Sequence, residues 1–170
     1  MRILLVIGVV LMFGCKENIQ DKFKDTPAKI NMEEVLIQQQ KAMIKNDSII
    51  IANFLEKKEL EMVQTGTGLR YTIHEKAAGE LIQSGERIFL EYVITDLAED
   101  TLYSSEKSGV MDLDVDFSHA ESGLHELVKN MRKGERALAV LPSHLAYGLA
   151  GDDYKIPAYT TLVFDVKILR

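Results

Sequence analysis

Hydrophobic positions alternate with polar ones over much of residues 61–170, which is the period of strands with one buried face. Turns rich in glycine and serine, at 66–68 and 84–86, separate these runs, and another apolar run ends at Leu141-Pro142. The alternation predicts a sheet. Its expected inward-facing positions are Leu69, Tyr71, Ile73, Ile88, Leu90, Tyr92, Ile94, Leu113, Val115, Phe117, Leu162, Phe164, Val166 and Ile168.

One segment inside this region has helical spacing instead. Apolar residues repeat every three or four positions from Ser122 to Met131, with Ser122 as the expected N-cap. Two cations and Gly134 follow, as is common where helices end. Strands around a single short helix predict an α+β fold, in which a curved antiparallel sheet wraps around the helix.

The last two predicted strands are joined by a loop of roughly eighteen residues, which is long for a compact domain. The loop contains Gly148 and Gly151, an Ile156-Pro157 pair, and three tyrosines. Tyr147 is a functional candidate, because an aromatic residue in a glycine-containing loop does less for a core and binding residues concentrate on loops.

Residues 31–60 carry helical spacing and predict a helical arm. Asn31 can cap it, because its side-chain oxygen can accept hydrogen bonds from free backbone N–H groups. The triplet Asn46-Asp47-Ser48 either breaks the helix or only marks its middle. The arm either packs on its own domain or forms a dimer or partner contact. We favour the first, because the half around Gln38-Gln39-Gln40 is too polar for a sustained coiled-coil seam.

The first fifteen residues differ in composition from the rest of the chain. A positive start precedes an unbroken apolar run from Ile3 to Phe13, too short to span a bilayer but typical of a signal-peptide core. Cys15 follows and is the only cysteine, so no intramolecular disulfide can form. The end of this run, 12–15, resembles a bacterial lipobox, in which the cysteine becomes the lipidated first residue. The alternatives are an ordinary signal peptide cut elsewhere and a short anchor that stays.

The expected organisation is therefore a lipoprotein signal peptide over 1–14, a polar tether over 15–30, the arm over 31–60 and one domain over 61–170. Composition agrees with a soluble domain, at 46% hydrophobic and 27% charged residues. The formal charge of −6 is spread along the chain without a Lys/Arg cluster, which argues against nucleic acid as a partner.

Other chemical motifs fail on spacing. Asp112, Asp114 and Asp116 suggest calcium, but Phe117 stands where an EF-hand loop needs glycine, so we expect the solvated face of a strand. The four histidines have no recognisable ligand spacing. Gly66 and Gly68 lack the third glycine of a dinucleotide loop. The sequence predicts no metal site and no cofactor.

Several motifs follow one another in the chain: Gly123 to Met131, Gly134-Glu135-Arg136, Leu145-Ala146-Tyr147-Gly148, Ile156-Pro157 and Thr161 to Val166. In this order they resemble the FKBP-type peptidyl-prolyl cis-trans isomerases, and the likeness covers about Gly85 to Arg170. Together with the lipobox and the arm, the segment 142–146 looks most like the gliding motility-associated isomerase lipoproteins of gliding bacteria.

The resemblance implies a proline pocket between the helix and the concave face of a half-wrapped sheet. Its catalytic positions fall on Tyr92, Tyr147 and Phe164. The other two loop tyrosines, Tyr154 and Tyr159, match no pocket position and are expected only to pack within the loop. The implied activity assists folding of exported or surface proteins, with proline-containing polypeptides as substrates. The substrate-binding positions fall on Leu102, Tyr103, Met111, Ala120, Glu121, Leu124 and Ile156.

The sequence departs from the family pattern at five of these positions. Leu124 replaces a tryptophan, Met111 a common phenylalanine, and Glu121 an apolar residue. Tyr103 stands in place of an aspartate, after Leu102 in place of an aromatic residue. These changes predict a shallower, less polar pocket. They leave a second hypothesis open, a lipid-anchored binding or scaffold module with little or no catalysis.

The expected location is the cell envelope, with acylated Cys15 anchoring the protein to a bacterial membrane. The outer membrane is preferred, with the domain facing the periplasm or the surface. A homodimer through the arm is the remaining expected partner.

Overall fold

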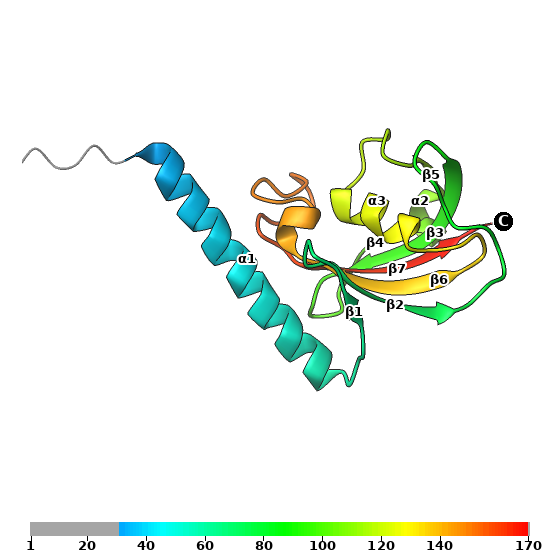
Figure 1. The fold of residues 1–170 in the computed structure, drawn as a ribbon, viewed down its shortest axis with the longest axis horizontal. Coiled ribbons are helices and arrows are strands. Elements are labelled where there is room, and N and C mark those ends of the chain that lie inside the picture. The colour runs from blue at the N-terminus through cyan, green and yellow to red at the C-terminus, as the bar shows by residue number, and fades with distance from the viewer. Residues whose placement is uncertain (1–30, 170) are drawn as a thin grey trace, which may run out of the picture.

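The computed structural model describes residues 31–169 (Figure 1). The expected signal peptide at 1–14, the tether at 15–30 and the lipidation site at Cys15 lie outside the described residues. Within the described part, none of the helices combines the length and the apolar character needed to cross a membrane.

Seven strands form one antiparallel sheet in the order β1-β2-β6-β7-β3-β4, and β5 pairs with the same strand, β3, as β4 does. The four-residue helix α2, Ser105–Ser108, separates β4 from β5 and so interrupts this edge of the sheet. The strands are β1 (Val63–Gln64), β2 (Arg70–Glu75), β3 (Arg87–Thr95), β4 (Thr101–Ser104), β5 (Met111–Asp114), β6 (Arg136–Leu141) and β7 (Leu162–Ile168).

Helix α3, Ser122–Lys129, covers one face of this sheet (Figure 1). Its apolar residues join the alternating side chains of the strands in the main core, where Leu127 and Phe164 are fully buried. The expected antiparallel sheet wrapped around a short helix is therefore confirmed. The inward-facing residues of β7 are confirmed as well, because Leu162, Phe164, Val166 and Ile168 are all 0% exposed.

Two local expectations were wrong. The N-cap of α3 is Glu121 rather than Ser122, and it makes no side-chain capping bond. Phe117 is 76% exposed and does not continue the buried face of Leu113 and Val115. The reason is that β5 ends at Asp114 and the backbone turns, with Asp116 in the left-handed region at φ 66°. Alternation alone does not reveal where a strand ends.

The arm is one continuous helix, α1, spanning Met32–Lys57. The side chain of Asn31 caps it by accepting from the backbone N–H of Glu33 at 3.2 Å. The C-terminal half of α1 packs on the face of the sheet opposite α3, where Ile51 is buried with Val140 and Val163. The alternating strands therefore carry a helix on each face.

Asp47 lies in the middle of α1 and is only 3% exposed. Its carboxylate accepts hydrogen bonds from the backbone N–H of Ser143 at 2.9 Å and from the Ser143 hydroxyl at 2.7 Å. Next to it, the Arg70 guanidinium donates to the Ser48 hydroxyl at 3.1 Å. The polar triplet that interrupts the apolar pattern is thus the point at which the arm is tied to the domain.

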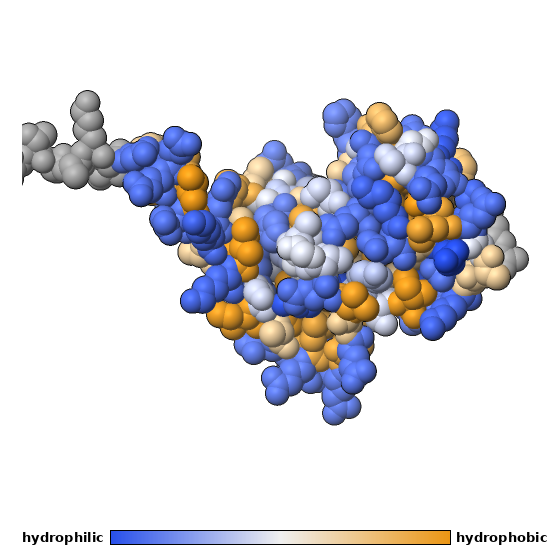
Figure 2. All heavy atoms as spheres, viewed as in Figure 1, coloured by the Kyte–Doolittle hydropathy of each residue, from blue (hydrophilic) through white to orange (hydrophobic). Residues whose placement is uncertain are grey.

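The N-terminal half of α1 extends beyond this contact (Figure 1). Hydrophobic residues remain visible along the helix on the side that faces the domain (Figure 2). Met32, Leu36 and Ile44 are 67%, 52% and 43% exposed. The expectation that the arm packs on its own domain therefore holds for the C-terminal half of α1 only.

Replacing Asp47 with alanine should lower the free energy of unfolding by about 1–3 kcal/mol, because it leaves the buried N–H and hydroxyl of Ser143 without an acceptor. Urea denaturation followed by circular dichroism measures the change. Asp47→Asn keeps an acceptor oxygen and should lose less. Lys45→Ala, at an exposed position of the same helix, serves as the control. An Asp47→Ala protein as stable as the control would contradict the anchoring role.

Candidate functional site

The structure brings the sequence-predicted site residues together from strands, helix and loop that are far apart in the chain. All but Glu121 belong to the main core cluster or pack against it, and Glu121 adjoins the cluster as the neighbour of Ala120. Buried within the cluster are Leu124, Ile156 and Phe164, and packed against it with partial exposure are Tyr92, Leu102, Tyr103, Met111, Ala120 and Tyr147.

The base of this site is closed. Phe164 on β7 is 0% exposed and Leu124 on α3 is 1% exposed, so neither presents much surface to solvent. Their role in a site is to form its floor, and Leu124 does so without the flat ring and N–H of a tryptophan. The half-buried aromatic rings of Tyr92 and Tyr147 stand around this floor and supply the accessible apolar surface.

The loop 142–161 is folded on itself, which fixes the position of Tyr147. It begins with the 3-10 turn η2, Ser143–Leu145. The N–H of Gly148 donates to the Ser143 carbonyl at 2.8 Å, and the N–H of Tyr159 donates to the Gly148 carbonyl at 2.8 Å. Gly151, at φ 73°, cannot be replaced easily, because a Cβ there would lie 2.1 Å from the Ile156 carbonyl oxygen.

Tyr147 presents the clearest hydrogen-bond donor of the site. Burial raises the pKa of its hydroxyl, and the neighbouring carboxylate of Glu121 raises that pKa further. Both effects disfavour the charged phenolate. The hydroxyl is therefore protonated at physiological pH, and a carbonyl oxygen that takes the place of Glu121 can accept its hydrogen bond.

Asp152 is a site residue that the sequence pattern did not reveal. One carboxylate oxygen accepts a hydrogen bond from the Tyr103 hydroxyl, which comes from β4 on the opposite side. The other accepts from the backbone N–H groups of Tyr154, Lys155 and Ile156, at 2.9, 2.8 and 2.7 Å. A carboxylate is thus present at the wall where the sequence has a tyrosine in place of the expected aspartate.

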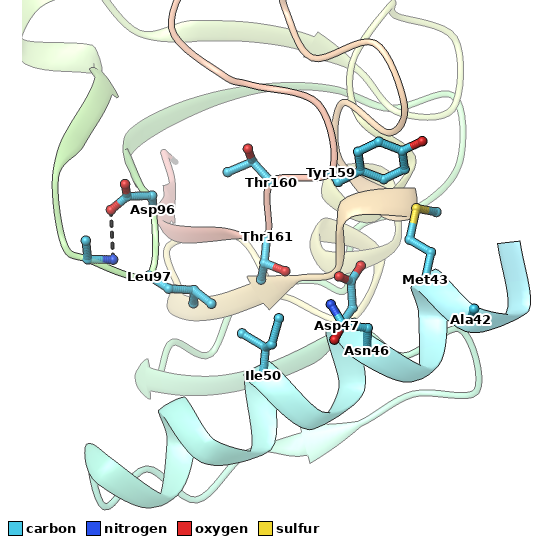
Figure 3. A pocket seen from close by; sticks show the side chains of 11 residues that line it. Ala42, Met43, Asn46, Asp47, Ile50, Asp96, Leu97, Tyr159, Thr160 and Thr161 are labelled. Atoms are coloured by element: carbon cyan, nitrogen blue, oxygen red, sulfur yellow. Dashed lines mark hydrogen bonds between the residues drawn. The ribbon is translucent and has the colours of Figure 1, made fainter. Parts of the chain in front are cut away.

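The other two tyrosines of the loop do not face this site. Tyr154 is 82% exposed, so the expectation that it packs within the loop was wrong. Tyr159 is 57% exposed and lies against α1 beside Met43 (Figure 3).

A cavity of about 590 Å³ lies between α1 and the domain and is distinct from this cluster (Figure 3). Asp47, Asn46 and Ile50 line it from the helix, with Thr161 facing them. None of the sequence-predicted site residues contributes to its walls. It marks a groove at the arm rather than the site around Phe164.

The acidic residues at 112–116 and the buried histidine have structural partners. Arg87 pairs with Asp112 on β5, and Lys129 pairs with Asp116 at 2.8 Å. The expectation of a strand face was wrong for Asp116, because β5 ends at Asp114. The ring of His125 accepts from the backbone N–H of Asp116 at 2.9 Å. Across residues 31–169, no group of three or more histidine, cysteine or acidic side chains is arranged to hold a metal ion.

Known proteins that are similar to this chain share its fold. The model of the FKBP-type peptidyl-prolyl cis-trans isomerase family matches residues 79–169. FkpA of Escherichia coli K12, an FKBP-type isomerase, is 32% identical over 112 residues. A probable isomerase of the same name from Neisseria meningitidis is 29% identical over 150 residues.

These alignments cover 66% and 84% of this chain, but only 41% and 55% of the two relatives. The chain thus spans about half the length of the curated relatives it matches. The crystal structure of E. coli FkpA superposes with a TM-score of 0.62 at 28% identity and covers 89% of this chain and 78% of that one. The structure of AtFKBP13, also at 0.62 but 21% identical, covers 65% of this chain and 98% of that one and supports the fold.

Proposed function

This chain belongs to the FKBP-type peptidyl-prolyl cis-trans isomerase family, and on that premise we propose that it catalyses the isomerisation of X–Pro bonds in polypeptides. The observation that carries the proposal is the gathering of the predicted pocket residues over Phe164, with the protonated Tyr147 hydroxyl beside them.

The reaction requires no covalent chemistry. Rotation about a peptide bond faces a barrier of about 18–20 kcal/mol because of amide resonance. The twisted transition state loses the charge separation of the planar amide, so an apolar, water-excluding surface favours it over the ground state. A rate gain of about 10³ needs about 4 kcal/mol of such differential binding.

The residues of the site fit this requirement. Phe164 and Leu124 form an apolar floor, and the rings of Tyr92 and Tyr147 can enclose a proline ring and exclude water. The Tyr147 hydroxyl can hold a substrate carbonyl while the bond turns. Acid–base or nucleophilic groups are not required, and the neutral state of Tyr147 suits a hydrogen-bond donor.

We extend the proposal to the location of the protein and to its clients. The lipobox-like segment around Cys15 supports a lipoprotein of the cell envelope, anchored to a bacterial membrane and preferably the outer one. At that location, the clients would be exported or surface proteins that fold outside the cytoplasm. The resemblance to gliding motility-associated lipoproteins adds a role in gliding motility to this proposal.

A second candidate function follows from the same site. Leu124 removes the tryptophan from the pocket floor, and Tyr103 removes an aspartate from its wall. A chain with these changes can still bind proline-containing segments while accelerating rotation about the X–Pro bond only slightly. The alternative is therefore a lipid-anchored binding or scaffold module with an FKBP fold.

Purified protein should accelerate cis-trans isomerisation of a short X–Pro peptide in a protease-coupled assay. Tyr147→Phe should lower kcat/KM about three- to tenfold, because it removes a single hydrogen bond worth about 0.5–1.5 kcal/mol. The melting temperature should change little, because the ring remains in place. Phe164→Ala is less informative, because it opens a cavity in the core and costs about 3–5 kcal/mol.

Tyr154→Phe is the matched control, because it removes the same hydroxyl from a residue of the same loop that is 82% exposed. It should retain wild-type activity. A folded wild-type protein that isomerises the peptide no faster than buffer would reject the enzyme and favour the binding module.

We further propose that a second copy of the chain binds the exposed N-terminal half of α1. A hollow of about 360 Å³ lies between this half and the loop, and Leu36, Met43, Leu149 and Tyr159 are among its lining residues. Leu36 and Leu149 are 52% and 56% exposed there. Two such surfaces related by a twofold axis would bury each other's apolar residues.

Sedimentation of the wild type should therefore show a dimer, and Leu36→Lys should shift it to monomer by placing a charge in the contact. Gln38→Lys adds the same charge at an exposed polar position of α1 and should leave the dimer intact. A wild-type protein that stays monomeric at high concentration would exclude this interface.

The anchor has its own test in cells that export the full chain. Radiolabelled fatty acid should be incorporated into the wild type and not into Cys15→Ser, because Cys15 is the only cysteine. The variant should also leave the membrane fraction. Continued labelling of Cys15→Ser would refute the lipobox assignment.

A further inference from the structure

We propose that Asp152 and Tyr103 act as a pair of positioning residues for the isomerase site, an inference that rests on the proposed function. Neither group needs to touch the X–Pro bond that rotates. Their role is to fix the loop that carries Tyr147 and Ile156 against β4. The loop wall and the β4 wall of the site then keep a constant position relative to each other.

The first set of contacts lies within the turn 152–156. One oxygen of Asp152 accepts from three successive backbone N–H groups, ending with Ile156 at 2.7 Å. The N–H of Asp152 in turn donates to the Ile156 carbonyl at 3.0 Å. A single carboxylate thus determines how Ile156, which is 3% exposed, enters the core cluster.

The second part crosses to the other wall. The second oxygen of Asp152 accepts the hydrogen bond of the Tyr103 hydroxyl on β4. Lys155 adds two contacts in the same direction, because its ammonium donates to the Leu102 carbonyl at 2.9 Å and lies 4.8 Å from the centroid of the Tyr103 ring. The turn is therefore joined to β4 by three contacts from two side chains.

The wall on β4 needs such support. β4 is the last strand of the sheet and pairs only with Val93, Ile94 and Thr95 of β3. Past it the chain bulges out as α2. Without the contacts from the loop, one side of this short strand would have no partner among the described elements.

The charge states of the two groups favour the hydrogen bond between Tyr103 and Asp152, which is called the bridge below. The hydrogen bond to Asp152 raises the pKa of Tyr103 to about 12, so that its hydroxyl stays protonated. The pKa of Asp152 is depressed, because burial raises it less than the hydrogen bonds from Tyr103 and from the turn lower it. A neutral donor and a charged acceptor form a charge-assisted hydrogen bond, which is stronger than a neutral one.

This arrangement predicts which kinetic parameter depends on the bridge. Binding of a proline segment needs only the accessible apolar surface of the aromatic rings around the floor, whereas rotation requires the Tyr147 hydroxyl and the Ile156 wall to keep their positions relative to the turning bond. Loosening the loop should therefore lower kcat more than it raises KM.

Tyr103→Phe is the decisive variant, because it removes the bridging hydroxyl and keeps the ring that packs on the core. We expect kcat to fall about tenfold while KM changes less than twofold, as measured by exchange NMR on an X–Pro peptide. Tyr154→Phe, which removes a hydroxyl from the exposed side of the same turn, is the control and should match the wild type.

A double-mutant cycle separates positioning from general stability. Asp152→Ala should lower kcat further than Tyr103→Phe, because it also releases the turn. Adding Tyr103→Phe to Asp152→Ala should then have no further effect, since the hydroxyl acts through that carboxylate. Asp152→Asn keeps an acceptor for the turn and should recover part of the loss.

The pH dependence supplies a second readout. The folded pKa of Tyr103 is raised, so the stabilisation from its hydrogen bond is complete below the unfolded value of about 10 and is lost as the pH rises towards about 12. The depressed pKa of Asp152 places the acid limit below pH 4. The ratio of wild-type to Tyr103→Phe activity should therefore be constant from about pH 5 to 9.

The outcomes are distinct. An active wild type with a selective fall in kcat for Tyr103→Phe supports the bridge. An active wild type whose kcat is unchanged in Tyr103→Phe, or falls equally in Tyr154→Phe, overturns the positioning role and leaves the proposed function standing. A folded but inactive wild type overturns the proposed function, and the positioning role with it.

Discussion

The antiparallel pairing of β6 with β7 is the constraint on which the rest of the site depends. The two strands are in register from Arg136–Lys167 to Leu141–Leu162, so the loop between them must leave and return at neighbouring positions. That closure places Tyr147 and Ile156 above the strand that carries Phe164. This long loop is held in one shape because its own backbone, Asp152 and, from the arm, Asp47 satisfy its polar groups.

The alternation of β7 connects this site to the arm. Phe164 faces α3 and the site, whereas the neighbouring Val163 faces α1 with Val140 and Ile51. A second connection runs through Ser143, which accepts the loop N–H of Gly148 and donates to Asp47 of the arm. The arm and the rim of the site therefore rest on the same strand and the same turn, although they lie on opposite faces of the sheet.

Much of this could be predicted from the sequence because it depends on periodicity and local motifs. Alternation located the strands and their buried faces, and the family motifs predicted site residues that the fold gathers around Phe164. Contacts that need three-dimensional proximity could not be predicted. The Asp152–Tyr103 pair joins residues 49 positions apart, and the buried role of Asp47 depends on Ser143, 96 positions away. Phe117 was predicted wrongly for a different reason. It continues the alternation of β5, but the strand ends before it, so its side chain is exposed.

The bridge also changes what the departures from the family pattern mean. A tyrosine in place of an aspartate on β4 was expected to make the site less polar, yet its hydroxyl binds a carboxylate supplied by the loop. The two substitutions at this wall are thus compatible with an ordered site, whereas Leu124 in the floor has no such compensation among the described residues. A loop fixed in this way suits a reaction that depends on the geometry of a turning bond, and it equally preorganises a surface for binding. The Asp152–Tyr103 hydrogen bond therefore makes the departures at this wall compatible with both the isomerase and the scaffold, and only the rate of catalysis separates the two.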